Sequence, residues 1–272
     1  MKIQFDKMEG AGNDFIMIDN RSGDFPDSRK VAFVQNYCRR ALGIGADGVI
    51  FIEQDEEFDF AWDFYNSDGS HAEMCGNGAR CASRYAHKIG AAGREMTFRT
   101  IAGPIKGQLT ERGAKVQLSS AQLPEESVGI EVDGKHVSLW SLNTGVPHAV
   151  IRVDEVKDVD VEKLGRSIRR HAYFAPAGTN VDFFTIGDDG VVRIRTYERG
   201  VEGETLACGT GCVATSIVAG KFFGKASPVA LKAASGEELV VYFELKGAEA
   251  INVFLEGGAR LIFSGWVDDP DI

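Results

Sequence analysis

The chain has 272 residues, of which 44% are hydrophobic and 26% are charged, and its formal net charge is −10 at pH 7. These values are typical of a globular protein with one large or two smaller domains. The acidic excess argues against a nucleic-acid or anionic-membrane surface, and no apolar run has the length of a membrane span or a signal peptide. We therefore expect a cytoplasmic protein with no nucleic-acid partner and no membrane partner.

The first half of the chain predicts helices and strands in alternation. Residues 28–43 predict a helix that ends at Gly43, with one apolar stripe formed by Val31, Val34, Cys38 and Ala41. Strands are expected at 47–54 and within 58–70, where the second breaks into an "NSDGS" turn. A helix over 78–90 has a stripe of Ala79, Ala82, Tyr85, Ala86 and Ile89, and 95–120 alternates as in a β-meander.

A glycine motif at 43–48, "GIGADG", matches the G-x-G-x-x-G pattern by letter. A dinucleotide-binding loop needs a strand before these glycines and a helix after them. Here the predicted order is helix, glycines, strand. The motif is therefore not interpreted as a nucleotide site.

The second half predicts the same order of elements. A strand at 191–200 leads to a cysteine–glycine turn, a helix at 212–224 and strands up to residue 266. "MCGNGARCAS" aligns with "ACGTGCVATS", each ten or eleven residues after a strand tyrosine, Tyr65 or Tyr197. "GAGNDFIMI" (10–18) also echoes "AGTNVDFFTI" (177–186). A repeat of about 130 residues predicts two related α+β domains, with a boundary near residue 120.

Five cysteines, Cys38, Cys75, Cys81, Cys208 and Cys212, make a poor disulfide framework, and the odd number suits reduced thiols. The last four come as two pairs, but their spacings differ from the Cys-x2-Cys knuckle of structural zinc sites. Cys81 and Cys212 also fall on apolar helical stripes, where a free cysteine behaves as a small buried hydrophobe. We expect no metal site.

Cys75 and Cys208 each precede Gly-x-Gly at the predicted start of a helix. Unpaired amides and the helix dipole favour the thiolate there, which moves a pKa normally near ~8.5 toward neutrality. The same amides hold a carboxylate well, and the glycines let a ligand approach them. Two such sites suit removal of a proton from one face of a stereocentre and delivery of a proton to the other face. No cofactor signature is present, so we expect chemistry without a cofactor.

Taken together, these features resemble those of the diaminopimelate epimerase family over essentially the full length of the chain. The matching blocks are "KMEGAGNDFIMID" (7–19), "GIGADG" (43–48), "FYNSDGSHAEMCGNGARC" (64–81), "GVPH" (145–148), "GTNVDF" (178–183) and "YERGVEGETLACGTG" (197–211). The resemblance implies an α+β fold of two pseudo-symmetric domains, each a mixed, mostly antiparallel sheet wrapped around a central helix. It places the active site in the cleft between a half at 1–120, completed by the segment 262–272, and a half at 121–261.

The resemblance also implies the reaction and the residues that perform it. LL-2,6-diaminopimelate would be epimerised to the meso form without pyridoxal phosphate, for lysine and peptidoglycan synthesis, by a homodimer. Cys75 and Cys208 would be the base and acid pair, with Glu198 and His148 beside the reacting centre. Substrate would be bound by the amides of Gly76–Asn77 and Gly209–Thr210, and by Asn13, Asn66, Asn180, Glu198 and Arg199, the last clamping the distal carboxylate.

Two positions depart from the family pattern. Some members have glutamine where this chain has Gly48 and asparagine where it has Val146, and both positions are associated with substrate binding. A related racemase of another amino acid, such as histidine, is therefore an alternative. A thiol redox or metal-sensing protein that uses the same cysteines is an alternative of another class.

Overall fold

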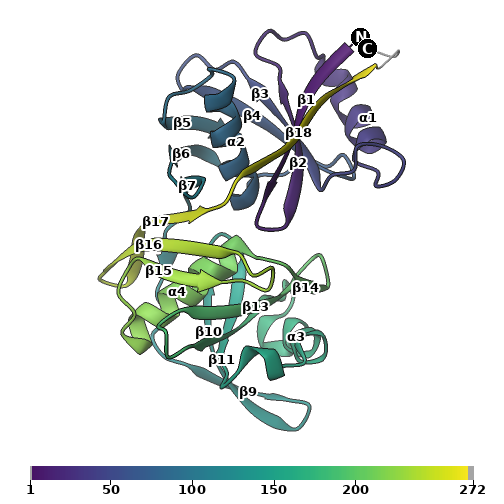
Figure 1. The fold of residues 1–272 in the computed structure, drawn as a ribbon. Coiled ribbons are helices and arrows are strands. Elements are labelled where there is room, and N and C mark those ends of the chain that lie inside the picture. The colour runs from purple at the N-terminus through teal and green to yellow at the C-terminus, as the bar shows by residue number, and fades with distance from the viewer. Residues whose placement is uncertain (1, 269–272) are drawn as a thin grey trace. The chain divides into compact units, whose positions relative to one another are not determined.

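The computed structural model describes residues 2–268 (Figure 1). The chain separates into two compact units, of which unit 1 is Met1–Val116 with Glu256–Ile272 and unit 2 is Gln117–Leu255. The expected division at 120/121 thus lies four residues beyond the observed one, and the segment that rejoins unit 1 begins at Glu256. Residues 269–272 of the expected C-terminal segment lie outside the described residues.

Unit 1 is a mixed sheet with two helices. Its elements are β1 (Lys2–Gly10), β2 (Asn13–Asp19), α1 (Asp27–Tyr37), β3 (Gly48–Glu53), β4 (Phe60–Asn66), α2 (Gly76–Lys88), β5 (Glu95–Thr100), β6 (Gly103–Leu109), β7 (Ala114–Gln117) and β18 (Arg260–Asp268). The strands pair in the order β18–β1–β2–β3–β4–β5–β6–β7. The pairs β2–β3 and β4–β5 are parallel and the others are antiparallel.

Unit 2 is built in the same way. Its elements are β8 (Ala121–Gln122), β9 (Val128–Val132), β10 (Lys135–Asn143), β11 (Pro147–Arg152), η1 (Val156–Asp158), α3 (Val161–Arg169), η2 (Ala172–Phe174), β12 (Asn180–Ile186), β13 (Val192–Glu198), β14 (Gly203–Thr205), α4 (Gly209–Phe223), β15 (Val229–Lys232), β16 (Glu238–Lys246) and β17 (Glu249–Gly257). The pairs β11–β12 and β13–β15 are parallel, whereas β10–β11, β12–β13 and β15–β16 are antiparallel.

The two units repeat one topology. The series β1, β2, α1, β3, β4, α2, β5, β6 corresponds to β10, β11, α3, β12, β13, α4, β15, β16, with parallel pairs at the same two places. The predicted fold class is therefore confirmed: two pseudo-symmetric α+β halves with mostly antiparallel sheets.

The strand registers assign equivalent positions in the two halves. Val49 faces Tyr65 and Ile16 in unit 1, as Val181 faces Tyr197 and Ala149 in unit 2. Tyr65 and Tyr197 are therefore counterparts. The expected echo between 10–18 and 177–186 is wrong, because the first segment forms β2, whose counterpart is β11, and the second forms β12, whose counterpart is β3.

A buried helix lies at the centre of each unit. Helix α2 packs against β1, β2, β3 and β6 (Figure 1). Its predicted stripe is confirmed, since Ala79, Ala82, Tyr85 and Ala86 are buried and Ile89 is half-buried at the core. In unit 2, α4 packs against β10–β13, β15 and β16. Cys81 and Cys212 are buried in these helices, as predicted.

Helix α1 differs from its predicted form. It ends at Tyr37 rather than Gly43, and Ala41 beyond it has a positive φ of 66°. Val31 is 41% exposed, whereas Lys30, Phe33 and Val34 form the buried face. The prediction failed because three carboxylates neutralise Lys30, and the lysine can therefore occupy the core side of the helix. The expected order of helix, glycines and strand around 43–48 is confirmed.

Within residues 2–268, no helix has both the length and the apolar character needed to cross a membrane.

Candidate active site

Cys75 is the N-cap of α2, the last extended residue before the helix begins at Gly76. Its Sγ accepts a hydrogen bond from the amide of Gly78 at 3.5 Å. A Cβ on Gly78 would lie 3.1 Å from Ile50 and 3.6 Å from Phe15, so the glycine lets this turn pack closely on β2 and β3. Cys75 itself is half-exposed and packs against the hydrophobic core of unit 1.

Asn13 and Asn77, two predicted substrate-binding residues, are joined by a hydrogen bond. Asn77 Nδ2 donates to Asn13 Oδ1 at 2.7 Å, and Asn13 Nδ2 donates to Asp47 Oδ2 at 3.0 Å. The fully buried Arg80 donates to Asn77 Oδ1 at 2.7 Å. Arg80 and Asp47 thereby fix the orientation of both amides. This role of Arg80 and Asp47 was not predicted from the sequence.

Asn66 lies apart from this group. It is exposed at the end of β4, and its Nδ2 donates to Ser70 Oγ at 3.1 Å within the 66–70 turn. The structure therefore gives Asn66 the turn-forming role that asparagine commonly has. A role in substrate binding stays a prediction.

Cys208 occupies the equivalent place before α4, but its environment differs. It is only 7% exposed, and its Sγ lies 3.4 Å from Thr210 Oγ1. Burial raises the pKa of the Cys208 thiol well above its ordinary value, and the charges of Glu198 and Asp182 raise it further. Burial and the two carboxylates therefore oppose the thiolate that the helix start was expected to favour at Cys208.

His148 lies beside Thr210 and is completely buried. Its Nδ1 is 2.7 Å from Asp182 Oδ2, and its Nε2 is 3.0 Å from Thr210 Oγ1. Thr196 Oγ1 donates to the other oxygen of Asp182 at 2.7 Å. Asp182 was not predicted from the sequence as a site residue. An acidic residue within the apolar strand "NVDFFTI" nevertheless indicates a buried carboxylate that needs a polar partner.

Asn180, Glu198 and Arg199 complete the unit 2 group. Asn180 Oδ1 accepts the backbone amide of Arg199 at 2.7 Å, and its Nδ2 lies 3.4 Å from His148 Nε2. Burial raises the pKa of Glu198, and the nearby Asp182 adds to that shift. The Arg199 side chain donates to the carbonyl of Ala177 at 3.2 Å. These three residues therefore lie around the same buried histidine.

The two departures from the family pattern occupy related positions. Counting along the paired strands, Val146 is the counterpart of Asn13, and Gly48 is the counterpart of Asn180. A Cβ on Gly48 would lie 2.4 Å from the Tyr65 carbonyl oxygen, so β3 passes β4 too closely for a side chain there. Each of these asparagines is thus present in one half only.

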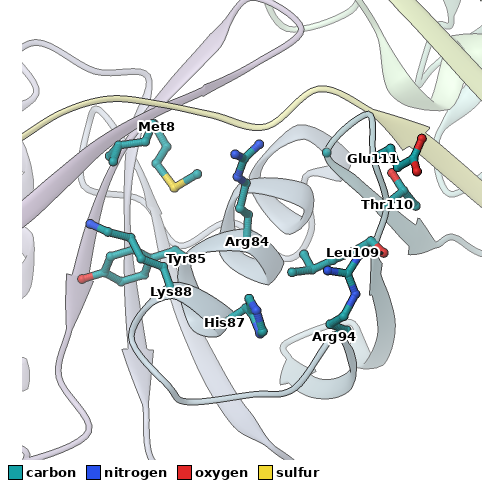
Figure 2. A pocket seen from close by; sticks show the side chains of 11 residues that line it. Met8, Arg84, Tyr85, His87, Lys88, Arg94, Leu109, Thr110 and Glu111 are labelled. Carbon is teal, nitrogen blue, oxygen red and sulfur yellow. Dashed lines mark hydrogen bonds between the residues drawn. The ribbon is translucent and has the colours of Figure 1, made fainter.

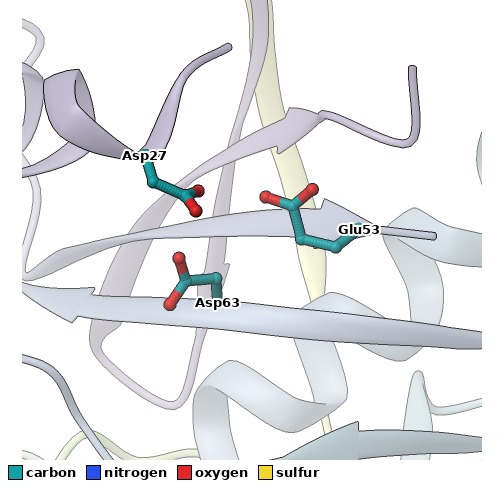
Figure 3. A group of neighbouring side chains, drawn as sticks. All are labelled: Asp27, Glu53 and Asp63. Carbon is teal, nitrogen blue, oxygen red and sulfur yellow. The ribbon is translucent and has the colours of Figure 1, made fainter. Parts of the chain in front are cut away.

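An acidic group in unit 1 has the spacing of a metal site but holds a lysine. Asp27, Glu53 and Asp63 converge from α1, β3 and β4 (Figure 3). Lys30 Nζ lies 2.7, 2.6 and 2.9 Å from their respective carboxylate oxygens. The ammonium group thus lies between the three carboxylates and anchors α1 to the sheet.

A cavity of about 370 Å³ opens at the C-terminal end of α2 (Figure 2). Arg84, Lys88 and Arg94 line it, together with the apolar Met8 and Leu261. Arg84 donates to the Ala259 carbonyl at 2.8 Å, and Lys88 is paired with Asp6. These two cations already have partners, and no predicted site residue lines this cavity.

The family model for diaminopimelate epimerase matches residues 5–124 and 140–262. The chain is 46% identical to a diaminopimelate epimerase of Aquifex aeolicus (strain VF5), with 97% of each chain covered. It is 38% identical to the enzyme of that name from Archaeoglobus fulgidus, covering 97% of this chain and 96% of that one.

Solved structures with lower identity share the fold. A phenazine biosynthesis protein of the PhzF family from Bacillus anthracis has a TM-score of 0.75 at 13% identity, with 99% of this chain and 100% of that chain covered. A probable proline racemase from Agrobacterium radiobacter K84 has a TM-score of 0.68 at 17% identity, over 99% and 94% of the chains. With a repeated fold and a cysteine before the central helix of each half, the chain belongs to the diaminopimelate epimerase family of isomerases.

Proposed function

We propose that this protein interconverts LL-2,6-diaminopimelate and meso-diaminopimelate by a two-base mechanism, for lysine and peptidoglycan synthesis. The observation that carries the proposal is a cysteine at the start of the central helix in both halves of the repeat. Membership of the family supports the choice of substrate. Each cysteine serves one face of the α-carbon, so an L centre and a D centre are handled by the same pair of groups.

In the proposed reaction, Cys75 starts as the thiolate and Cys208 as the thiol. The amide of Gly78 points at Cys75 Sγ and stabilises negative charge there. The raised pKa of Cys208 keeps its proton available for donation. Cys75 removes the α-proton from one face and Cys208 delivers a proton to the other. In the reverse reaction, Cys75 and Cys208 exchange these roles.

The developing carbanion needs stabilisation because the α-proton of an amino acid is only weakly acidic. The first-turn amides of Gly76–Asn77 and Gly209–Thr210 are proposed to hold the carboxylate of the reacting centre. Asn13 and Asn180 are proposed to bind its polar groups, and Arg199 the distal carboxylate. Glu198 and His148, beside Cys208, are proposed to tune its proton transfer.

The test is proton NMR of candidate amino acids in D2O with reduced protein and no added metal or cofactor. We expect the α-signals of LL- and meso-diaminopimelate to disappear and the two isomers to interconvert. Lysine lacks the distal carboxylate and should exchange far more slowly. Equal exchange of lysine and diaminopimelate would contradict the substrate assignment, exchange of histidine alone would favour a histidine racemase, and exchange of none would favour a redox or metal-sensing protein.

A further inference from the structure

A continuous line of hydrogen-bonding groups runs from Cys208 to a buried carboxylate within unit 2. Cys208 Sγ lies 3.4 Å from Thr210 Oγ1, which lies 3.0 Å from His148 Nε2. His148 Nδ1 in turn lies 2.7 Å from Asp182 Oδ2. His148 and Asp182 are both completely shielded from solvent. Such a line can move a proton between its ends without bulk water.

The chemistry of the carboxylate fixes which nitrogen of His148 carries the hydrogen. An ionised carboxylate only accepts hydrogen bonds, so His148 carries its hydrogen on Nδ1 and presents a free lone pair on Nε2. Two donors face this lone pair, the Thr210 hydroxyl at 3.0 Å and Asn180 Nδ2 at 3.4 Å. In the arrangement that we infer, the nearer Thr210 hydroxyl donates to Nε2, and its oxygen accepts from the Cys208 thiol. Thr196 donates to the second oxygen of Asp182 at 2.7 Å and so keeps that carboxylate in place.

The fold brings the carboxylate to this point by a close approach. A Cβ on Gly211, in the first turn of α4, would lie 2.3 Å from Asp182 Oδ1. Because residue 211 is a glycine, the helix start can rest directly on the Asp182 carboxylate.

The other half of the repeat has apolar side chains at the corresponding strand positions. By strand register, the counterparts of His148 and Asp182 are Phe15 and Ile50. Both pack near Gly78 in the turn that follows Cys75. The two cysteines therefore share a backbone setting, but the strand positions that hold His148 and Asp182 in unit 2 hold Phe15 and Ile50 in unit 1.

We propose that Asp182 is a positioning residue that holds His148 in the Nδ1–H tautomer, so that His148 exchanges protons with Cys208 through the Thr210 hydroxyl. In the step, the thiol hydrogen passes to Thr210 Oγ1 while the Thr210 hydrogen passes to His148 Nε2. A thiol and a neutral imidazole become a thiolate and an imidazolium, with no net gain or loss of protons. The Asp182 carboxylate stabilises the imidazolium, and Cys208 thereby alternates between acid and base. The inference rests on the proposed function for its catalytic consequence only.

The first experiment compares Asp182→Asn with the native protein in the absence of substrate. Histidine ¹⁵N NMR should show His148 protonated on Nδ1 in the native protein and a mixture of tautomers in the variant. Alkylation of Cys208 by iodoacetamide, followed by mass spectrometry with Cys75 as internal reference, should slow by about 10-fold, because the thiolate–imidazolium form is lost. A purely electrostatic role gives the opposite sign, since removing a nearby negative charge eases ionisation of the thiol.

The second experiment is kinetic. With diaminopimelate as substrate, kcat of Asp182→Asn should fall by about 100-fold while KM changes by less than about threefold. Thr185→Val, on the same strand β12 but outside the line of groups, should keep native kinetics and tautomer. Thr185 is matched because it is also buried and donates a hydrogen bond, to the Asp154 carbonyl at 2.8 Å.

A second pair of variants covers the case in which Asp182→Asn does not fold. Thr210→Val removes the bridging hydroxyl at constant shape and should reproduce the slow alkylation of Cys208, whereas Thr210→Ser should restore the native rate. An unchanged His148 tautomer in Asp182→Asn, or faster alkylation of Cys208 in either Asp182→Asn or Thr210→Val, would overturn the inference. Because tautomer and alkylation are measured without substrate, a protein inactive on diaminopimelate would refute the proposed function and leave these outcomes interpretable.

Discussion

At the scale of single residues, the two cysteines that precede helices show that a shared local motif does not by itself fix the pKa of a thiol. Cys75 accepts an amide hydrogen bond and is half-exposed, whereas Cys208 is buried with Glu198 and Asp182 nearby. Burial and two nearby negative charges raise the pKa of Cys208, which is opposite to the effect expected of a helix N-terminus. The surrounding groups, and not the helix start alone, therefore affect the protonation of Cys208.

Substituting each of the five cysteines by alanine, one at a time, tests which of them epimerisation requires. We expect Cys75→Ala and Cys208→Ala to lose epimerisation by more than ~10⁴-fold, because no other group serves the lost face. Cys38→Ala, Cys81→Ala and Cys212→Ala should remain active, since these side chains are buried in the cores. Full activity in either of the first two variants, assayed with diaminopimelate, would refute the two-base mechanism.

Asp14 offers a test of stability against pH. Burial would raise the pKa of Asp14, but hydrogen bonds and charges from Arg40 and Lys7 outweigh it and lower the pKa to about 2. A lowered folded-state pKa stabilises the protein above the ordinary value of 3.8, and this stabilisation is lost as the pH falls toward 2.

We therefore expect Asp14→Asn to lose about 2 kcal/mol of unfolding free energy at pH 7, with the difference from the native protein shrinking below about pH 4. Urea denaturation at several pH values measures this difference. The exposed Asp188→Asn serves as a control and should match the native protein throughout. A deficit of constant size from pH 7 to pH 3 would show that the carboxylate charge is not responsible.

At the scale of elements, the starts of α2 and α4 depend on glycine for different reasons. Gly78 allows α2 to pack on the apolar side chains of Ile50 and Phe15. Gly211 allows α4 to rest on the Asp182 carboxylate. The Asp182 carboxylate is hydrogen-bonded to His148 and Thr196, and it can therefore shift less than a hydrocarbon side chain to make room for an added Cβ.

Gly211→Ala should accordingly displace the first turn of α4. We expect a loss of about 1–3 kcal/mol in unfolding free energy. We also expect at least about a 10-fold loss of kcat, because His148 and Cys208 move apart. Denaturant unfolding and steady-state assays measure the two effects. Gly93→Ala, whose new Cβ would meet only the Glu95 carbonyl at 3.6 Å, should change neither, and a native-like Gly211→Ala would contradict the close packing described above.

At the scale of the whole molecule, the repeat supplies two copies of one scaffold, and the sequence of each copy makes them chemically different. The positions of His148 and Asp182 in unit 2 are occupied by Phe15 and Ile50 in unit 1. Asn13 of unit 1 corresponds to Val146 of unit 2, and Asn180 of unit 2 corresponds to Gly48 of unit 1. The proposed two-base mechanism requires such a difference, since one cysteine must hold a proton while the other lacks one.

Oxidation tests whether the two cysteines serve one carbon atom. If both sulfurs reach the same α-carbon, a disulfide is within reach in the absence of substrate, because it needs Cβ atoms only ~3.5–4.5 Å apart. We expect mildly oxidised protein to be inactive through a Cys75–Cys208 bridge and to recover with a thiol reductant. Non-reducing peptide mapping decides this. A bridge between other cysteines, or inactive protein without a bridge, would count against the shared carbon.

A homodimer stays a prediction, and β18 supplies a specific test of it. This strand exposes Leu261, Ile262, Phe263 and Trp266, an unusual concentration of apolar side chains on a surface. We expect sedimentation equilibrium to give twice the chain mass for the native protein and the monomer mass for Ile262→Lys. An unchanged dimer in the variant would exclude this surface, and a native monomer would refute the dimer.

Much of the local structure followed from the sequence because it depends on short-range patterns. The apolar period of α2, the strands around the tyrosines and the helix starts after Cys75 and Cys208 were all visible in it. Helix α1 was misjudged at Val31 and Ala41, because burial of Lys30 depends on carboxylates from Glu53 and Asp63 on distant strands. Its end at Tyr37 was likewise missed.

The sequence by itself determined the family, the α+β repeat and the two cysteine–glycine helix starts, since motifs and periodicity lie along the chain. Only the tertiary structure decided which positions of the two halves correspond, because a strand's counterpart depends on its pairing and not on a similar string of letters. It also decided that Cys208 is buried beside Asp182 and His148, which are 34 residues apart in the chain. The protonation of a thiol depends on groups that surround it in space, and those groups come together only when β11, β12 and α4 pack.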